Sequence, residues 1–268
     1  MRMPLVHSLR SFRLHPRLYG VPGVLVLLIL WETIPRQGTT IRHLVPPASS
    51  VLKVFFLQWT TGEFLNHVAV TLLRIAEGYV AAVVVAIPLG LLMGYWRRLF
   101  DLFELTIELF RPIPSSALIP IAIIFFGIGH GMHAFVVFLA SFMPILLGTI
   151  DGVRAVDPVL INSARTLGTS AARVFSKVLL PASLPHIVTG LRVSIALAVI
   201  VAVSSEMILS SEGLGWMVLY AQRTMRIPHI YAGILALATL GYVLNRLFLV
   251  LESRVIGWHH SSRAKRWQ

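Results

Sequence analysis

Cysteine is absent from the 268-residue sequence, which excludes disulfides, thiolate catalysis and cysteine-based metal sites. Charged residues are scarce as well: they make up 13% of the chain, whereas a soluble domain carries roughly 25%. Hydrophobic residues reach 56%, mean hydropathy is +0.80, and the apolar runs approach the ~20 residues that cross a bilayer. The composition therefore predicts an all-α, polytopic membrane protein.

A phosphate-binding loop is missing too. The three lysines, Lys53, Lys177 and Lys265, follow Leu, Ser and Ala, so the Gly-Lys pair of such a loop does not occur. Histidines and carboxylates do not cluster at a common depth, as a membrane-embedded enzyme would require. His130 and His133 are expected on a short external turn without a metal. We expect no catalytic residue, no metal site and no cofactor bound by this chain.

Six apolar stretches predict six transmembrane helices. They cover residues 20–34, 65–95, 114–129, 132–150, 187–209 and 230–251. The first could also belong to a signal peptide, but the sequence from Glu32 to Pro35 offers no small-residue cleavage site, which favours an uncleaved helix. The chain thus divides into a basic N-terminus (1–19), a transmembrane domain (20–252) that includes a polar loop (151–185), and a basic tail (253–268).

The basic residues predict the orientation. Six spans put both termini and the 151–185 loop on one side, which carries 14 of the 23 Lys and Arg residues, while the opposite side carries five. Because cytoplasmic loops are enriched in these residues, the termini and the loop are predicted to be cytoplasmic. The formal net charge of +12 is therefore a topology signal, and it requires no nucleic-acid partner.

The polar loop predicts a short helix with defined ends. Asp157 can cap free backbone N–H groups and Pro158 suits the first helical position, so a helix is expected over 159–167. Gly168 ends it, since glycine tolerates the left-handed conformation that closes many helices. The apolar side of this helix is formed by Val159, Leu160, Ala164 and Leu167. Such a side can press into a groove of a partner, which is a common mode of recognition.

A second helix is predicted after the glycine. Ser170 can cap a helix that runs from 171 to about 180. Pro181 and Pro185 are expected to interrupt its passage into the fifth span, because proline lacks the N–H that a helix interior uses. The loop would thus be an exposed element held out by the membrane bundle.

The loop also carries a recognisable motif. Its residues are Ser163, Ala164, Gly168, Val178, Leu180 and Pro181. Their spacing resembles the Glu-Ala-Ala motif of ABC-transporter permease subunits, with Asn162 where the family usually has Glu and Ser163 for the first Ala. The segments FRPIPSSALIPIAIIFFGIG and SEMI followed by GLG are similar to the nitrate/sulfonate/taurine branch, and the likeness extends from about residue 45 onward.

The resemblance implies a MetI-like permease core whose first loop helix, the coupling helix, sits in a groove of an ATP-binding subunit. The coupling residues would be Leu160, Asn162, Ser163, Ala164, Leu167, Gly168, Val178, Leu180 and Pro181. It also implies a second permease copy, two ATP-binding subunits that carry ATP and Mg, and an extracytoplasmic solute-binding protein at a bacterial inner membrane. The expected solute is a small anion such as nitrate, an aliphatic sulfonate or taurine; a pyrimidine or thiamine precursor is the alternative.

Charges inside spans are expensive and mark candidates for the translocation path. Glu206 and Ser194 lie on one ridge of the fifth span; Glu206 is either a path or gate residue or a hydrogen-bonded carboxyl at an interface. Arg111 either anchors at lipid headgroups or lines the cytoplasmic mouth, where a fixed cation would help an anionic solute. Arg74 and Glu77 are three residues apart and are expected to pair locally.

The second span carries small residues at every fourth position. They are Gly78, Ala82, Ala86, Gly90 and Gly94. A ridge of this kind lets another helix approach closely. The neighbour is either a helix of the same chain or the surface of another subunit, and the sequence leaves both open.

A stand-alone secondary transporter or channel is the alternative function. It would predict inverted repeats, paired ionisable residues near the midplane and no need for a long docking loop. No repeat is visible between the two halves, and most charges sit at span edges. The sequence therefore favours the membrane-spanning subunit of an ATP-driven importer.

Overall fold

The computed structural model describes residues 20–38, 44–60 and 62–256, and this part of the chain is helical without a β-strand. The predicted basic N-terminus (1–19) and the tail from residue 257 lie outside the described residues. The elements are α1 (Gly20–Thr33), η2 (Ile34–Arg36), α3 (Ala48–Trp59), α4 (Gly62–Tyr95), α5 (Arg97–Phe110), η3 (Ser115–Leu118), α6 (Ile119–Phe126), α7 (His130–Arg154), α8 (Pro158–Thr166), α9 (Ala171–Val174), η4 (Phe175–Leu179), α10 (Leu180–Leu209), α11 (Leu214–Arg223) and α12 (Ile227–Val255). The all-α prediction is confirmed.

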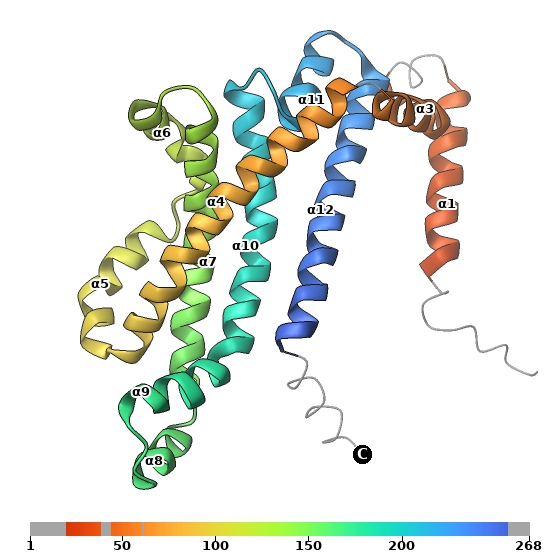
Figure 1. Cartoon of the computed structure of the whole chain (residues 1–268). Coiled ribbons are helices and arrows are strands. Elements are labelled where there is room, and N and C mark those ends of the chain that lie inside the picture. Colours follow the sequence, from red (N-terminus) through yellow and green to blue (C-terminus); the bar gives the residue numbers. More distant parts are fainter. Residues whose placement is uncertain (1–19, 39–43, 61, 257–268) are drawn as a thin grey trace, which may run out of the picture.

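Helices α4, α7 and α10 form the core, and α7 packs along both of the others (Figure 1). Its side chains Ile145, Leu146 and Ile150 are almost fully buried there. Helix α12 packs against α3, α10 and α11, whereas α1 stands apart from the bundle and leaves the side chains of Val24 to Leu30 exposed (Figure 1). A helix that is apolar on every exposed side is typical of a membrane environment.

The small-residue ridge of α4 packs against α7 of the same chain. A Cβ atom added at Gly78 would collide with the Ala134 carbonyl oxygen and lie 2.7 Å from the Val137 Cβ. Added Cβ atoms at Gly90 and Gly94 would each lie 2.6 Å from a Cβ of α7. Of the two alternatives that the sequence left open, intrachain packing is therefore the one that the structure supports.

Replacing Gly78 with alanine should lower the free energy of unfolding by about 1–3 kcal/mol, because the added methyl group overpacks the α4–α7 contact. Gly241→Ala in α12 is the matched control, since no heavy atom lies within 4 Å of its added Cβ. There the higher helix propensity of alanine should leave stability unchanged or raise it by about 0.5–1 kcal/mol. Thermal unfolding in detergent checks both, and equal shifts would contradict the packing.

The predicted count of six spans is not confirmed. Within the described residues, four helices are long and apolar enough to cross a membrane: 64–95, 130–154, 171–209 and 227–254. The third span, expected over 114–129, does not reach the length of a span by itself: α5 and the segment 115–126 meet at 88°, and only together do they reach that length. Pro112 and Pro114 explain the break, since proline removes a helical donor and bars helical geometry from the preceding residue.

The expected interruption before the fifth span is wrong. Residues 171–209 form one continuous helix that passes through α9, η4 and α10, with Pro181 in the first turn of α10 and Pro185 inside it. The segment η4 is a π-helix that ends just before Pro181. Local π geometry and neighbouring helices commonly accommodate the backbone groups that proline leaves free in membrane helices. The polar loop is therefore mechanically continuous with a core helix.

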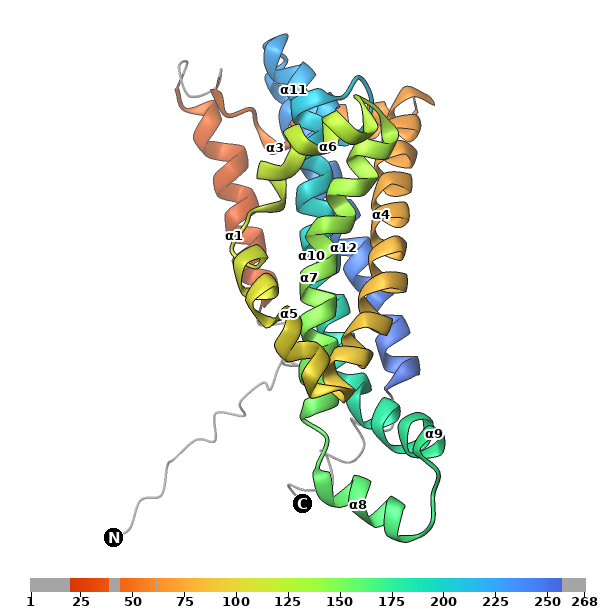
Figure 2. The ribbon, with the colours of Figure 1, turned by 90° about the vertical axis from the view of Figure 1, so that its left-hand side faces the viewer.

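The two ends of the bundle carry different elements. The end of α12 and both α8 and α9 lie at one end, and α8 projects beyond the bundle (Figures 1 and 2). Helices α3, α6 and α11 lie at the opposite end (Figures 1 and 2). Helix α11 lies between the predicted spans 187–209 and 230–251, where no helix was predicted. The cytoplasmic location of the α8 end stays a prediction.

Candidate functional site

Local chemistry fixes both ends of α8 as the sequence predicted. The Val159 N–H donates to the Asp157 carboxylate at 2.8 Å, and Pro158 is the first helical residue. At the other end Gly168 has φ of +74°, and its N–H donates to the Arg165 carbonyl at 2.9 Å. The Thr169 N–H reaches back to the Ala164 carbonyl at 3.1 Å, which completes a Schellman motif. The helix is short but has a defined start and stop.

Helix α8 presents apolar side chains to the outside. Val159, Leu160 and Leu167 are exposed by 66%, 53% and 84%, and we call these three residues the α8 tip. Asn162 and Ser163 are also exposed, whereas Ala164 is half-buried. Outside a membrane span, such a cluster of exposed apolar side chains marks an interaction surface. No described element covers the tip, because α8 packs against α9 and η4 on its other side.

The remaining motif residues join the loop to the core. Val178 in η4 and Leu180 at the start of α10 are half-buried, and Pro181 is exposed. Between them Leu179 is buried, and Phe175 makes an edge-on contact with Tyr95 of α4 at 6.0 Å between ring centroids. The second half of the motif thus anchors the loop, while its first half is presented outward.

Glu206 lies in a fully buried polar cluster between α4, α10 and α11. The Arg74 Nη1 donates to its Oε1 at 2.9 Å, and the Thr71 hydroxyl donates at 3.0 Å. This geometry matches the alternative of a hydrogen-bonded carboxyl at an interface. The predicted local pair of Arg74 with Glu77 is wrong: Arg74 points into the core, whereas Glu77 is half-exposed and lies 2.6 Å from the His130 ring nitrogen Nε2.

The same cluster holds the start of α11. The backbone N–H of Gly215 donates to Glu206 Oε2 at 3.0 Å, and that of Leu214 donates to the Thr71 hydroxyl at 2.9 Å. Gly213 has φ of +103°, and an added Cβ would lie 2.5 Å from Glu206 Oε1. These contacts explain why the GLG segment carries glycines. Without a Cβ atom at either glycine, the backbone can approach the Glu206 carboxylate, which accepts the hydrogen bond of the Gly215 N–H.

His133 is another correction. It lies in α7, not on an external turn, and its side chain is buried with Nδ1 2.9 Å from the Ser205 hydroxyl of α10. The reason is that α7 begins at His130, so His133 falls almost one turn inside the helix. In the described part of the chain no three His, Asp or Glu side chains gather as a metal site would require.

The other two path candidates differ in their surroundings. Ser194 is fully buried, and its hydroxyl donates to the Leu191 carbonyl of its own helix at 2.8 Å. The Tyr79 hydroxyl of α4 donates to the same carbonyl at 2.9 Å. Arg111 is exposed and lines a cavity at the bend between α5 and η3. Neither Glu206 nor Ser194 lines that cavity, so the structure does not bring the three candidates together.

Comparisons with known proteins agree with this architecture. Residues 86–257 match the family described as binding-protein-dependent transport system inner membrane component. A Methanocaldococcus jannaschii ABC transporter permease is 35% identical, with 86% of this chain and 88% of the relative covered. The taurine transport system permease of Escherichia coli and a nitrate import permease of Synechocystis are 33% and 30% identical, each with 87% of both chains covered.

A solved structure shares the fold. An inward-facing structure of the MetNI methionine ABC transporter superposes with a TM-score of 0.64 at 18% identity and covers 73% of this chain and 97% of that one. The expectation of a MetI-like permease core is confirmed.

Proposed function

Because this chain belongs to the family of binding-protein-dependent inner membrane components, and is thus the permease component of an ABC importer, we propose that α8 is its coupling helix and that its solute is a small anion. The observation that carries the coupling role is the α8 tip. Its apolar side chains are exposed on a helix with both ends fixed, beyond the end of the bundle (Figure 2). A helix of this kind suits a groove in a separate ATP-binding subunit.

In the proposed cycle, ATP binding closes two ATP-binding subunits and moves the α8 helices of two permease copies. The continuity of residues 171–209 supports this coupling, because a displacement at α9 is carried along one helix to the cluster around Glu206 at the opposite end. Continuous helices and packed side chains are the elements that transmit such movements. The α8 end would face the cytoplasm of a bacterial cell, with both termini on that side, and a solute-binding protein would dock at the end that carries α3, α6 and α11.

The proposed class of solute is more specific than what membership of the family implies. Relatives named for taurine and nitrate transport support a small anion. A pyrimidine or thiamine precursor is the alternative within the importer function, and the ligand of the cognate solute-binding protein would decide between them.

Purification with the cognate ATP-binding subunit, followed by reconstitution in liposomes, tests the proposal. ATP hydrolysis should rise when the solute-loaded binding protein is added, and solute uptake should require ATP. Uptake by this chain alone, driven by an ion gradient, would instead support a secondary transporter.

Asn162 allows a specific prediction about the docking surface. It is exposed on α8, where the family usually carries a glutamate, so Asn162→Glu should keep assembly with the ATP-binding subunit or tighten it by up to about tenfold through a charge-assisted hydrogen bond. Asn162→Gln is the control, since it lengthens the side chain without the charge and should leave the affinity unchanged. The affinity of the two purified subunits measures both. Loss of assembly in Asn162→Glu alone would show that the partner groove rejects the family's carboxylate.

A further inference from the structure

A cavity of about 380 Å³ lies where the broken helix bends toward the core. Arg111, Ser115 and Ser116 line one side, at the junction of α5 and η3. The opposite side is formed by α7 and α10, through Leu139, Ala140, Phe142, Met143, Pro144, Leu197 and Val201. At about 30 Å³ per water, the cavity has room for roughly a dozen water molecules, or for a hydrated small solute.

The cavity lies at the middle depth of the bundle. Helix α7 extends from residue 130 to 154, so the segment that lines the cavity is its centre. Leu197 likewise lies well inside the continuous helix 171–209. An arginine at the centre of a membrane helix costs about 2.5–3.5 kcal/mol unless water or a partner surrounds it. This depth argues against the headgroup anchor that the sequence left open for Arg111.

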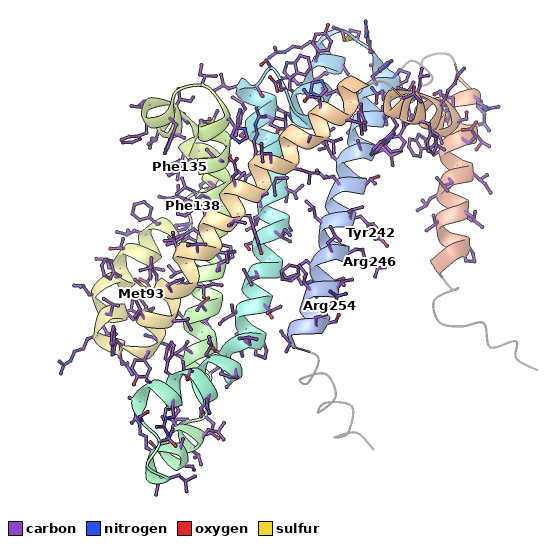
Figure 3. The ribbon with its side chains drawn as sticks, viewed as in Figure 1. Met93, Phe135, Phe138, Tyr242, Arg246 and Arg254 are labelled. Atoms are coloured by element: carbon purple, nitrogen blue, oxygen red, sulfur yellow. The ribbon has the colours of Figure 1, made fainter. Side chains whose placement is uncertain are left out.

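Arg111 has no partner among the described residues, as is also the case for Arg97 and Arg98 at the start of α5. Three arginines inside the long helices are engaged instead: Arg74 with Glu206, Arg192 with Glu252 at 4.0 Å, and Arg246 with the hydroxyl and ring of Tyr242 (Figure 3). The Ser115 and Ser116 hydroxyls likewise make no hydrogen bond within the described part of the chain. One fixed cation and two hydroxyl donors therefore share a cavity at mid-depth without a protein acceptor.

We propose that this cavity is an anion-binding station of the translocation path, in which Arg111 pairs with a small oxyanion while Ser115 and Ser116 donate hydrogen bonds to it. Guanidinium groups bind planar or tetrahedral oxyanions through two parallel N–H donors. Binding sites of membrane transporters commonly lie near the midplane, at breaks in helices. The proposal rests on the transport function proposed above and names the site at which that function recognises charge.

The cysteine-free chain permits a direct measurement of the local potential. Ser116→Cys, in the transporter assembled with its ATP-binding subunit in liposomes, would be labelled with an anionic sulfonatoethyl and a cationic trimethylammonium methanethiosulfonate. After correction for the reactivity of a free thiol, the anionic reagent should react about tenfold faster, because a nearby cation concentrates anions in a poorly screened site. Nitrate and ethanesulfonate should slow the labelling.

Variants of Arg111 show whether this arginine causes the preference for the anionic reagent. Arg111→Gln should abolish the preference for the anionic reagent and the protection by nitrate and ethanesulfonate, and Arg111→Lys should keep both. Arg246→Gln removes an arginine that is engaged elsewhere on α12 and should change neither. If Arg111→Gln kept the same preference for the anionic reagent as the unmodified arginine, the anion-binding station would be ruled out. It would also be ruled out by a cysteine that reacts with neither reagent because lipid or a second copy seals the cavity. These rates do not depend on ATP hydrolysis, so failure of the importer function would appear separately, as absent stimulation by the binding protein.

Discussion

Replacing Glu206 with alanine is expected to lower the free energy of unfolding by about 3–5 kcal/mol, since it leaves a buried arginine without its counter-charge. The side chain of Glu206 is fully buried and that of Arg74 is 7% exposed, so water cannot replace the lost carboxylate. The substitution also removes the acceptor of the Gly215 N–H at the start of α11. Thermal unfolding in detergent and the yield of monodisperse protein measure the effect.

The control is a longer and more exposed ion pair between α10 and α12. Arg192 of α10 is 4.0 Å from Glu252 of α12 and their side chains are 49% and 19% exposed, so Glu252→Ala should cost only about 1 kcal/mol. A double variant, Arg74→Met with Glu206→Leu, should recover much of the loss, because it removes the buried charge together with its partner. Equal destabilisation by Glu206→Ala and Glu252→Ala would contradict the structural role of the cluster.

Replacing Leu167 with aspartate should weaken binding of the ATP-binding subunit by tenfold or more. The side chain is 84% exposed, so the permease itself should fold normally. In the proposed groove, however, the carboxylate would be removed from water without a partner, which costs several kcal/mol. The amount of ATP-binding subunit that co-purifies, together with the thermal stability of the variant, separates loss of docking from loss of fold.

Leu44 offers the same substitution at the other end of the bundle. It is 66% exposed and lies beyond the reach of any partner bound at α8, so Leu44→Asp should leave co-purification unchanged. Normal assembly in Leu167→Asp would show that the α8 tip is not the docking surface.

Features determined by neighbouring residues could be predicted from the sequence. The cap at Asp157 and the left-handed Gly168 involve hydrogen bonds within a few residues, so residue type alone indicated where α8 begins and ends. The small-residue ridge of α4 was visible as a four-residue repeat, but its neighbour was not. That required the packing of α7, whose contacting residues lie 56 to 59 positions later in the chain.

Features that depend on distant segments were missed. Glu206 lies 132 residues after Arg74, and nothing local distinguishes this partner from the nearby Glu77. The same holds for His133, which meets Ser205 across the α7–α10 interface. The helical continuation through Pro181 also contradicts the local rule, and the π-helix Phe175–Leu179 lies directly before it. Only the side chains of α4 and α10 together define the cluster that holds α11.

Site-specific cross-linking from α8 tests the central claim most directly. Single cysteines at Leu167→Cys and Leu44→Cys, each in the otherwise cysteine-free chain, would carry a short photo-reactive group in the complex with the cognate ATP-binding subunit. Illumination should join the ATP-binding subunit to the chain through residue 167 and not through residue 44. Absence of that product from residue 167, or equal yields from both positions, would contradict the assignment of α8 as the coupling helix.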